Sequence, residues 1–197
     1  MALLKPIGYG DLRVLFVCAG NAFRSQLAEY VFDRTFEGGY VSFSAGLLPE
    51  YAGMHVHEAL DPRALQILTR HRVNLPNAIC HQVTRDDIAA ADIVLVMESW
   101  MKLKLENKYP SFSDRIFLLR SFAGYKNRPE LHDVNGPVTE RRVMHPYKQI
   151  RQAILRIKRE KRLEDVEETH RELPRTDSCN FIDGDSEKAM RLRRKRG

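Results

Sequence analysis

A cysteine and an arginine, six positions apart, are the residues whose chemistry stands out in this chain. Cys18 ends the apolar run 14–17, and Arg24 follows a short loop that contains Gly20 and Asn21. A thiolate is a strong nucleophile, and a guanidinium is a planar fork that pairs with two oxygens of a phosphate. Because a nucleophile and a phosphate-binding group flank one loop, the pattern indicates a phosphate-binding loop with a cysteine nucleophile.

The composition of the loop suits the binding of an anion. Backbone N–H groups converge on an anion where a short loop curls into the start of a helix, and the helix dipole adds positive charge there. Glycine permits close approach, and asparagine tolerates left-handed backbone geometry. The positive surroundings favour the thiolate of Cys18, and Ser25 is placed to hydrogen-bond its sulfur. We predict that the substrate is bound by Ala19, Gly20, Asn21, Ala22, Phe23 and Ser25.

Alternating strands and helices are expected to position this loop. Short apolar runs bounded by turn residues predict parallel strands at 12–17, 40–44, 91–97 and 115–119. Helical spacing predicts helices at 24–36 and from 62 to before 76. A short helix is expected after Thr84, and another around 100–105 after Ser99. The last helix is expected to begin at Thr139 or at Pro146 and to end at 161. The order predicts an α/β fold in three layers, a four-stranded parallel sheet flanked by helices, with the phosphate-binding loop after the first strand. Ligands of such sheets bind at the carboxyl ends of the strands, where Cys18 lies.

Composition limits the other classes of function. The chain has 197 residues and a net charge of +6, of which the run 191–196 supplies five. The remainder is therefore near neutral, which disfavours a strongly basic nucleic-acid binder. We expect one domain at 1–162 and a charged, partly disordered tail at 163–197, whose basic end could contact acidic partners or be solvated. Three scattered cysteines form neither a disulfide framework nor a zinc pattern, and no apolar run spans a membrane, so we expect a cytoplasmic protein.

The loop and two later segments resemble a known family. The residues from Cys18 to Ser25 resemble the signature C-x-G-N-x-x-R-S of the low-molecular-weight protein tyrosine phosphatases. The segments 44–46 (Ser-Ala-Gly) and 91–98 resemble further parts of that family, and the similarity covers about residues 12–160. The resemblance implies a four-stranded parallel α/β fold, a cysteinyl-phosphate intermediate, and neither a metal nor a cofactor.

The resemblance also implies roles for individual residues. Cys18 is the expected nucleophile, Arg24 binds the phosphoryl oxygens, and Asn21 and Ser44 hold the loop. The family takes its general acid from an aspartate in a late loop, usually followed by proline. The matching residue is Asp133, in the long connection 121–137, where valine follows it; the neighbouring His132 is the rival acid.

Departures from the family pattern bear on the substrate. Ala22 stands where many tyrosine-specific members carry isoleucine and arginine phosphatases carry threonine, and Phe23 stands where many members carry a second cysteine. The leading hypothesis is a protein tyrosine phosphatase. Its expected partner is a phosphorylated protein, such as a tyrosine kinase of bacterial polysaccharide export. The alternative, which the missing proline after Asp133 motivates, is a catalytically weak regulatory module that binds phosphate or phosphopeptides.

Overall fold

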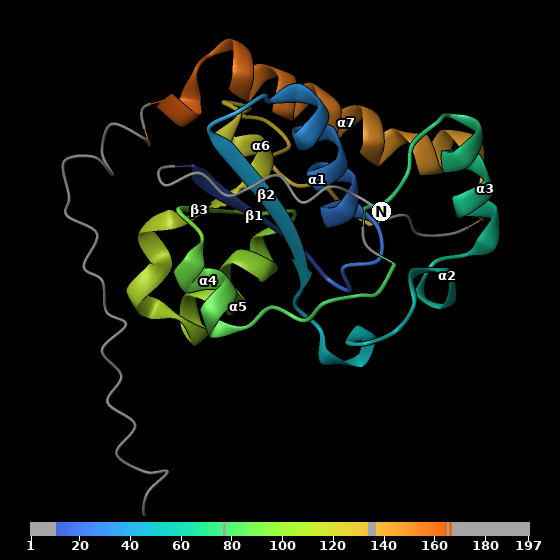
Figure 1. The fold of residues 1–197 in the computed structure, drawn as a ribbon, viewed down its shortest axis with the longest axis horizontal. Coiled ribbons are helices and arrows are strands. Elements are labelled where there is room, and N and C mark those ends of the chain that lie inside the picture. Colours follow the sequence, from blue (N-terminus) through green and yellow to red (C-terminus); the bar gives the residue numbers. More distant parts are fainter. Residues whose placement is uncertain (1–10, 77, 134–136, 165, 167–197) are drawn as a thin grey trace, which may run out of the picture. The chain divides into compact units, whose positions relative to one another are not determined.

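A four-stranded parallel sheet forms the centre of the structure (Figure 1). Its strands are β1 (Leu12–Cys18), β2 (Tyr40–Gly46), β3 (Ile93–Val96) and β4 (Ile116–Leu118), in the order β2-β1-β3-β4. The structure is a computed structural model that describes residues 11–76, 78–133, 137–164 and 166. The predicted α/β fold with four parallel strands is confirmed.

The register of the sheet fixes the position of Cys18. Strand β1 pairs in parallel with both β2 and β3, and Cys18 lies opposite Gly46. Because all ladders are parallel, the carboxyl ends of the strands lie at one edge of the sheet. The side chains of 14–17 in β1 are fully buried, as expected of a central parallel strand. The sheet therefore presents the cysteine at its carboxyl edge on a rigid support.

Helices cover both faces of the sheet. Figure 1 shows α1 (Arg24–Thr35) and α7 (Glu140–Arg159) side by side on one side, with α4 (Arg85–Ala90) and α5 (Ser99–Lys108) on the other. The remaining elements are η1 (Pro49–Tyr51), α2 (Val56–Ala59), α3 (Pro62–Arg70), η2 (Pro110–Arg115) and α6 (Leu119–Phe122). No helix among the described residues is both long and apolar enough to span a bilayer.

Some boundaries differ from the sequence prediction. The region between β2 and α3, expected to be a loop, contains η1 and α2, which are too short to produce a periodic pattern. Helix α5 begins at Ser99 itself, and its N-cap residue is Glu98. Helix α7 begins after Thr139, whose side chain accepts the N–H of Arg142, so Pro146 lies inside the helix. The long connection is shortened by α6.

The boundary between domain and tail stays a prediction. The described residues all belong to a compact unit that ends at Val166. Leu163, which we assigned to the tail, is buried in the hydrophobic core. Residues 167–197 lie outside the described part of the chain.

The two expected helix caps give a test of the fold. Thr84 Oγ1 accepts the N–H of Asp87 at 3.1 Å, and Asp87 Oδ2 accepts the N–H of Thr84 at 2.7 Å. We therefore expect Thr84→Ala to lower the free energy of unfolding by about 1 kcal/mol. Ser99 is exposed and makes no side-chain cap bond, so Ser99→Ala should change the free energy of unfolding by less than about 0.5 kcal/mol. Urea unfolding followed by circular dichroism measures the free energy of unfolding of both variants. Equal losses in the two variants would contradict the assignment of Thr84 as a helix cap.

Candidate active site

The loop after β1 is a concentrated set of hydrogen-bond donors. Residues 20–23 are buried, and Cys18 is only 3% exposed. Among the described residues, no acceptor takes a hydrogen bond from the five backbone N–H groups of residues 19–23. Helix α1 begins directly afterwards, at Arg24, and adds the positive end of its dipole. Buried N–H groups normally have partners, so this arrangement is that of an anion receptor.

The side chain of Asn21 fixes the shape of this loop. Asn21 has a φ of 58°, in the left-handed region, and is fully buried. Its Nδ2 donates to Ser25 Oγ at 3.0 Å and to Ser44 Oγ at 2.9 Å. Its Oδ1 accepts the N–H of His81 at 2.9 Å. The amide thus joins the loop to α1, to β2 and to the segment that precedes α4.

The sulfur of Cys18 lies beside a hydroxyl of this network. Ser25 Oγ is 3.1 Å from Cys18 Sγ. Because Ser25 Oγ accepts a bond from Asn21, its proton is free to point at the sulfur. Burial, and then the nearby charge of Cys18, raise the pKa of the Cys80 thiol above its usual value. Of the two free cysteines that are described, Cys18 therefore is the candidate nucleophile.

Two glycines allow the loop to pack between its neighbours. A Cβ on Gly46 would lie 2.7 Å from the carbonyl carbon of Gly20, so β2 approaches the loop backbone more closely than any side chain permits. A Cβ on Gly20 would lie 2.7–2.9 Å from the ring of Tyr51. The tyrosine ring therefore covers the loop on one side. Sequence reasoning missed Tyr51, because it lies in a segment without periodic signal.

The guanidinium of Arg24 connects the loop to the segment after α6. Arg24 is 2% exposed, and its NH1 donates to Glu98 Oε1 at 2.5 Å and to the carbonyl of Leu131 at 2.7 Å. Its NH2 donates to Asp133 Oδ2 at 3.0 Å. The structure thus brings together Cys18, Arg24 and Asp133, the three residues that we predicted to act on substrate. The contacts of Glu98 and Leu131 were not predicted, although Glu98 follows β3 at the same edge of the sheet.

A cavity of about 260 Å³ lies over the loop, and we call it the loop cavity. Its floor contains Cys18 and Arg24, and Asp133 lines its side. Most of the other lining is apolar or aromatic, and comprises Ala19, Gly20, Ala22, Phe23, Tyr51, Ala59, Leu60, Ala64, Val138 and Val143, together with Asp61. The cavity therefore combines an anion receptor at its base with apolar walls.

Asp133 is the best-placed proton donor of the candidates. His132, the rival, does not line the loop cavity; its Nδ1 contacts Glu98 Oε2 at 3.2 Å. Asp61 does line it, but hydrogen bonds from the side chain and then the backbone N–H of Arg63 hold the pKa of Asp61 below its usual value. An acid that resists protonation is a poor proton donor at neutral pH. Residues 134–136, which include the valine in place of the family's proline, lie outside the described residues.

Comparison with known proteins places the chain in a family. The family model "Low molecular weight phosphotyrosine protein phosphatase" matches residues 13–171. The chain belongs to this family. The predicted resemblance is therefore confirmed, and it extends over most of the described residues.

Several curated relatives carry names from the same family. The probable low molecular weight protein-tyrosine-phosphatase EpsP of Ralstonia nicotianae is 26% identical over 54% of this chain and 69% of the relative. The low molecular weight protein-tyrosine-phosphatase YfkJ of Bacillus subtilis is 30% identical over 59% of this chain and 66% of the relative. A protein-arginine-phosphatase of Bacillus subtilis is 25% identical over 64% of this chain and 81% of the relative.

Solved structures share the fold. A low molecular weight protein tyrosine phosphatase from T. tengcongensis superposes with a TM-score of 0.65 at 24% identity, over 76% of this chain and 99% of that chain. The YwlE arginine phosphatase from Geobacillus stearothermophilus superposes with a TM-score of 0.66 at 24% identity, over 79% of this chain and 96% of that chain. The two named activities share one architecture, so the fold alone does not determine which phosphorylated residue is the substrate.

The network of Asn21 gives a test of the site. Asn21→Ala removes three hydrogen bonds and puts a residue with a poor left-handed preference at φ 58°. We expect a loss of about 2–4 kcal/mol in the free energy of unfolding and weaker binding of inorganic phosphate. Asn107, exposed on α5, is the matched control, and Asn107→Ala should change stability by less than about 0.5 kcal/mol. Urea unfolding and phosphate titration measure the effects; similar stability for both variants would refute the proposed role of Asn21.

Proposed function

We propose that the protein is a cysteine-dependent phosphomonoester hydrolase that acts on phosphotyrosine in proteins through a cysteinyl-phosphate intermediate. The observation that carries the proposal is the set of five loop N–H groups, for which the described part of the chain offers no acceptor, beside Cys18 and the guanidinium of Arg24. These donors suit the three equatorial oxygens of a phosphoryl group in the transition state. Family membership supports the same chemistry.

In the first step, the thiolate of Cys18 attacks phosphorus in line with the leaving oxygen. The S–P bond forms as the P–O bond breaks, and Asp133 gives its proton to the leaving oxygen. Asp133 is bonded to Arg24 in the structure, and a bound phosphoryl group would compete for that guanidinium.

In the second step, water replaces the sulfur on phosphorus. Asp133, now a carboxylate, takes a proton from the attacking water, and the S–P bond breaks. The departing thiolate is stabilised by the hydroxyl of Ser25, which lies 3.1 Å from Cys18 Sγ. Inorganic phosphate then leaves, and the enzyme returns to its starting state.

The walls of the loop cavity favour an aromatic phosphoester. Tyr51 covers Gly20, and Leu60 and Val143 contribute aliphatic surface. Such walls bury the ring of phosphotyrosine, which is larger and more apolar than the side chain of phosphoserine. Asp61, which could pair with the guanidinium of phosphoarginine, already binds Arg63. These features support phosphotyrosine over both competitors.

The proposal extends to partners and location. The expected substrate is a phosphorylated protein, such as a tyrosine kinase of polysaccharide export. The relative EpsP of Ralstonia nicotianae is named a probable protein-tyrosine-phosphatase, which is consistent with a phosphotyrosine substrate. The two described cysteines are free, which suits a reducing, cytoplasmic compartment. Contact of the basic run 191–196 with an acidic partner is part of the proposal, and those residues lie outside the described ones.

Variants of Cys18 and Asp133 test the mechanism with p-nitrophenyl phosphate. Cys18→Ser should abolish turnover, and Asp133→Ala should lower kcat by about 10²–10⁴-fold. Asp61→Asn is the matched control in the same cavity, because asparagine also caps a helix, and it should leave kcat within about threefold. A near-normal rate for Asp133→Ala would show that another group is the acid. No turnover by the wild type, combined with tight phosphopeptide binding, would favour the regulatory module.

A panel of phosphopeptides tests substrate choice. Peptides of one sequence that carry phosphotyrosine, phosphoserine or phosphoarginine should differ in kcat/KM, with phosphotyrosine higher by at least about tenfold because it buries a ring against Tyr51. Tyr51→Ala should lower kcat/KM for the phosphotyrosine peptide more than for the phosphoserine peptide. A preference for phosphoarginine would overturn the assignment of substrate while leaving the phosphatase chemistry intact.

A further inference from the structure

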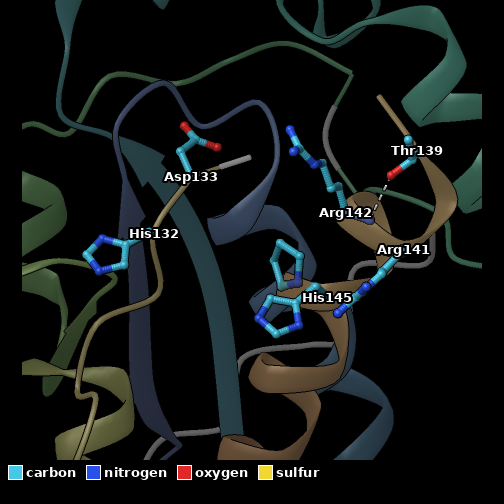
Figure 2. A pocket seen from close by; sticks show the side chains of 7 residues that line it. His132, Asp133, Thr139, Arg141, Arg142 and His145 are labelled. Atoms are coloured by element: carbon cyan, nitrogen blue, oxygen red, sulfur yellow. Dashed lines mark hydrogen bonds between the residues drawn. The ribbon is translucent and has the colours of Figure 1, made fainter. Parts of the chain in front are cut away.

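A second cavity lies next to the loop cavity and shares Asp133 with it. It has a volume of about 550 Å³ and is lined by His132, Asp133, Thr139, Arg141, Arg142, His145 and Pro146. We call it the basic cavity. Figure 2 shows His132 and Asp133 on one side of it, and the side chains of the first turns of α7 on the other.

The lining of the basic cavity is dominated by cationic and N–H-donating groups. Arg141 and Arg142 contribute guanidinium groups, and His145 contributes an imidazole, all from α7. Among the described residues of the lining, Asp133 is the only carboxylate, and it bonds to Arg24. Glu140, in the same turn of α7, lies outside the lining and bonds to His71 at 2.9 Å. The cavity is therefore complementary to an anion.

The basic cavity includes donor groups that bond to no other described residue. Within the described ranges, neither the guanidinium of Arg141 nor the imidazole of His145 has a hydrogen-bond or ion-pair partner, and both side chains are exposed. The backbone N–H of Arg142 is bonded to Thr139 Oγ1 at 3.4 Å, which fixes the first turn of α7. Two flexible donors thus stand on a helix whose start is held in place.

We propose that the basic cavity binds a second anionic side chain of the substrate polypeptide, a phosphorylated residue or a glutamate or aspartate near the phosphotyrosine. The proposal rests on the proposed function, since it takes the loop cavity as the site of the scissile phosphoester. An extended peptide advances about 3.3–3.6 Å per residue, so a side chain one to three residues away reaches a neighbouring cavity. Because both cavities are lined by Asp133, one peptide can occupy both.

A phosphate should bind there more strongly than a carboxylate. Guanidinium groups pair with phosphate through two parallel N–H···O bonds, and phosphate carries more charge and a third acceptor oxygen. The preferred substrate is accordingly a segment with two phosphorylated residues close together, and a segment with a flanking acidic residue is second. A neutral flanking residue gains nothing from Arg141 or His145.

The test uses the full chain and three phosphotyrosine peptides of one sequence. At one flanking position they carry a second phosphotyrosine, glutamate or glutamine. We expect kcat/KM to fall in that order for the wild type. In the double variant Arg141→Gln/His145→Gln the advantage of the doubly phosphorylated peptide over the glutamine peptide should shrink by about five- to twentyfold, because exposed charge-assisted contacts contribute a few-fold each.

Two controls separate the basic cavity from general charge effects. Arg151→Gln removes a positive charge from an exposed position of α7 outside the basic cavity, and it should preserve the order of the three peptides. Turnover of p-nitrophenyl phosphate, which is too small to reach the basic cavity, should be unchanged in the double variant and in Arg151→Gln. The proposal is overturned if the double variant slows the three peptides equally, or if Arg151→Gln has the same effect as the double variant.

Binding measurements keep the proposal separate from the proposed function. If the wild type fails to hydrolyse p-nitrophenyl phosphate, the proposed function fails, and the basic cavity is judged by binding alone. Calorimetric titration of Cys18→Ser should give affinities for the three peptides in the same order as the kcat/KM values of the wild type. Adding Arg141→Gln and His145→Gln to Cys18→Ser should remove the differences in affinity between the peptides. Equal affinities for the three peptides in Cys18→Ser would reject the second anionic site.

Discussion

The backbone conformation of Asn21 is the constraint on which the site depends. A φ of 58° is unfavourable for most residues, and here it turns the loop so that its N–H groups face inward. The three hydrogen bonds of the Asn21 side chain, to Ser25, Ser44 and His81, offset this cost. Because the loop N–H groups have no acceptor among the described residues, an anion in the loop cavity completes their hydrogen bonding. The affinity for phosphate and the strain of the loop therefore have one structural origin.

Arg24 extends this constraint to the distant segment that carries the proposed acid. A buried guanidinium is costly unless its donors are bonded, and Glu98, the carbonyl of Leu131 and Asp133 satisfy it. One side chain thus joins α1, the end of β3 and the connection before α7. Phosphate capture and placement of the acid are consequently coupled: a change at Glu98 would disturb both, although Glu98 does not line the loop cavity.

Local chemistry explains what the sequence could predict. The apolar strand, the glycine and asparagine, and the arginine that opens α1 each act over a few residues, so the fold and the cysteine loop were predictable. The capping box of Thr84 was predictable for the same reason. The contacts of Glu98, Tyr51 and Leu131 depend on segments that meet only when the sheet has formed, and no spacing in the chain encodes them. The basic cavity was not predicted, because charged residues on a helix are typical of a solvated face and no spacing in the chain places Arg141 and His145 opposite Asp133.

The valine after Asp133 raised the question of what positions the proposed acid without the family's proline. Proline fixes only its own φ and restricts the residue before it. In this chain the main chain just before Asp133 is held instead: the N–H of Leu131 donates to the carbonyl of Met97 at 2.8 Å, and its carbonyl accepts from Arg24. These bonds tie the acid-bearing segment to the end of β3 from the N-terminal side, so rigidity after Asp133 is not required to bring its carboxylate to the loop. Asp133 also lines the basic cavity, where Arg141 and His145 of α7 are the donors that we propose to select the flanking residues of a substrate.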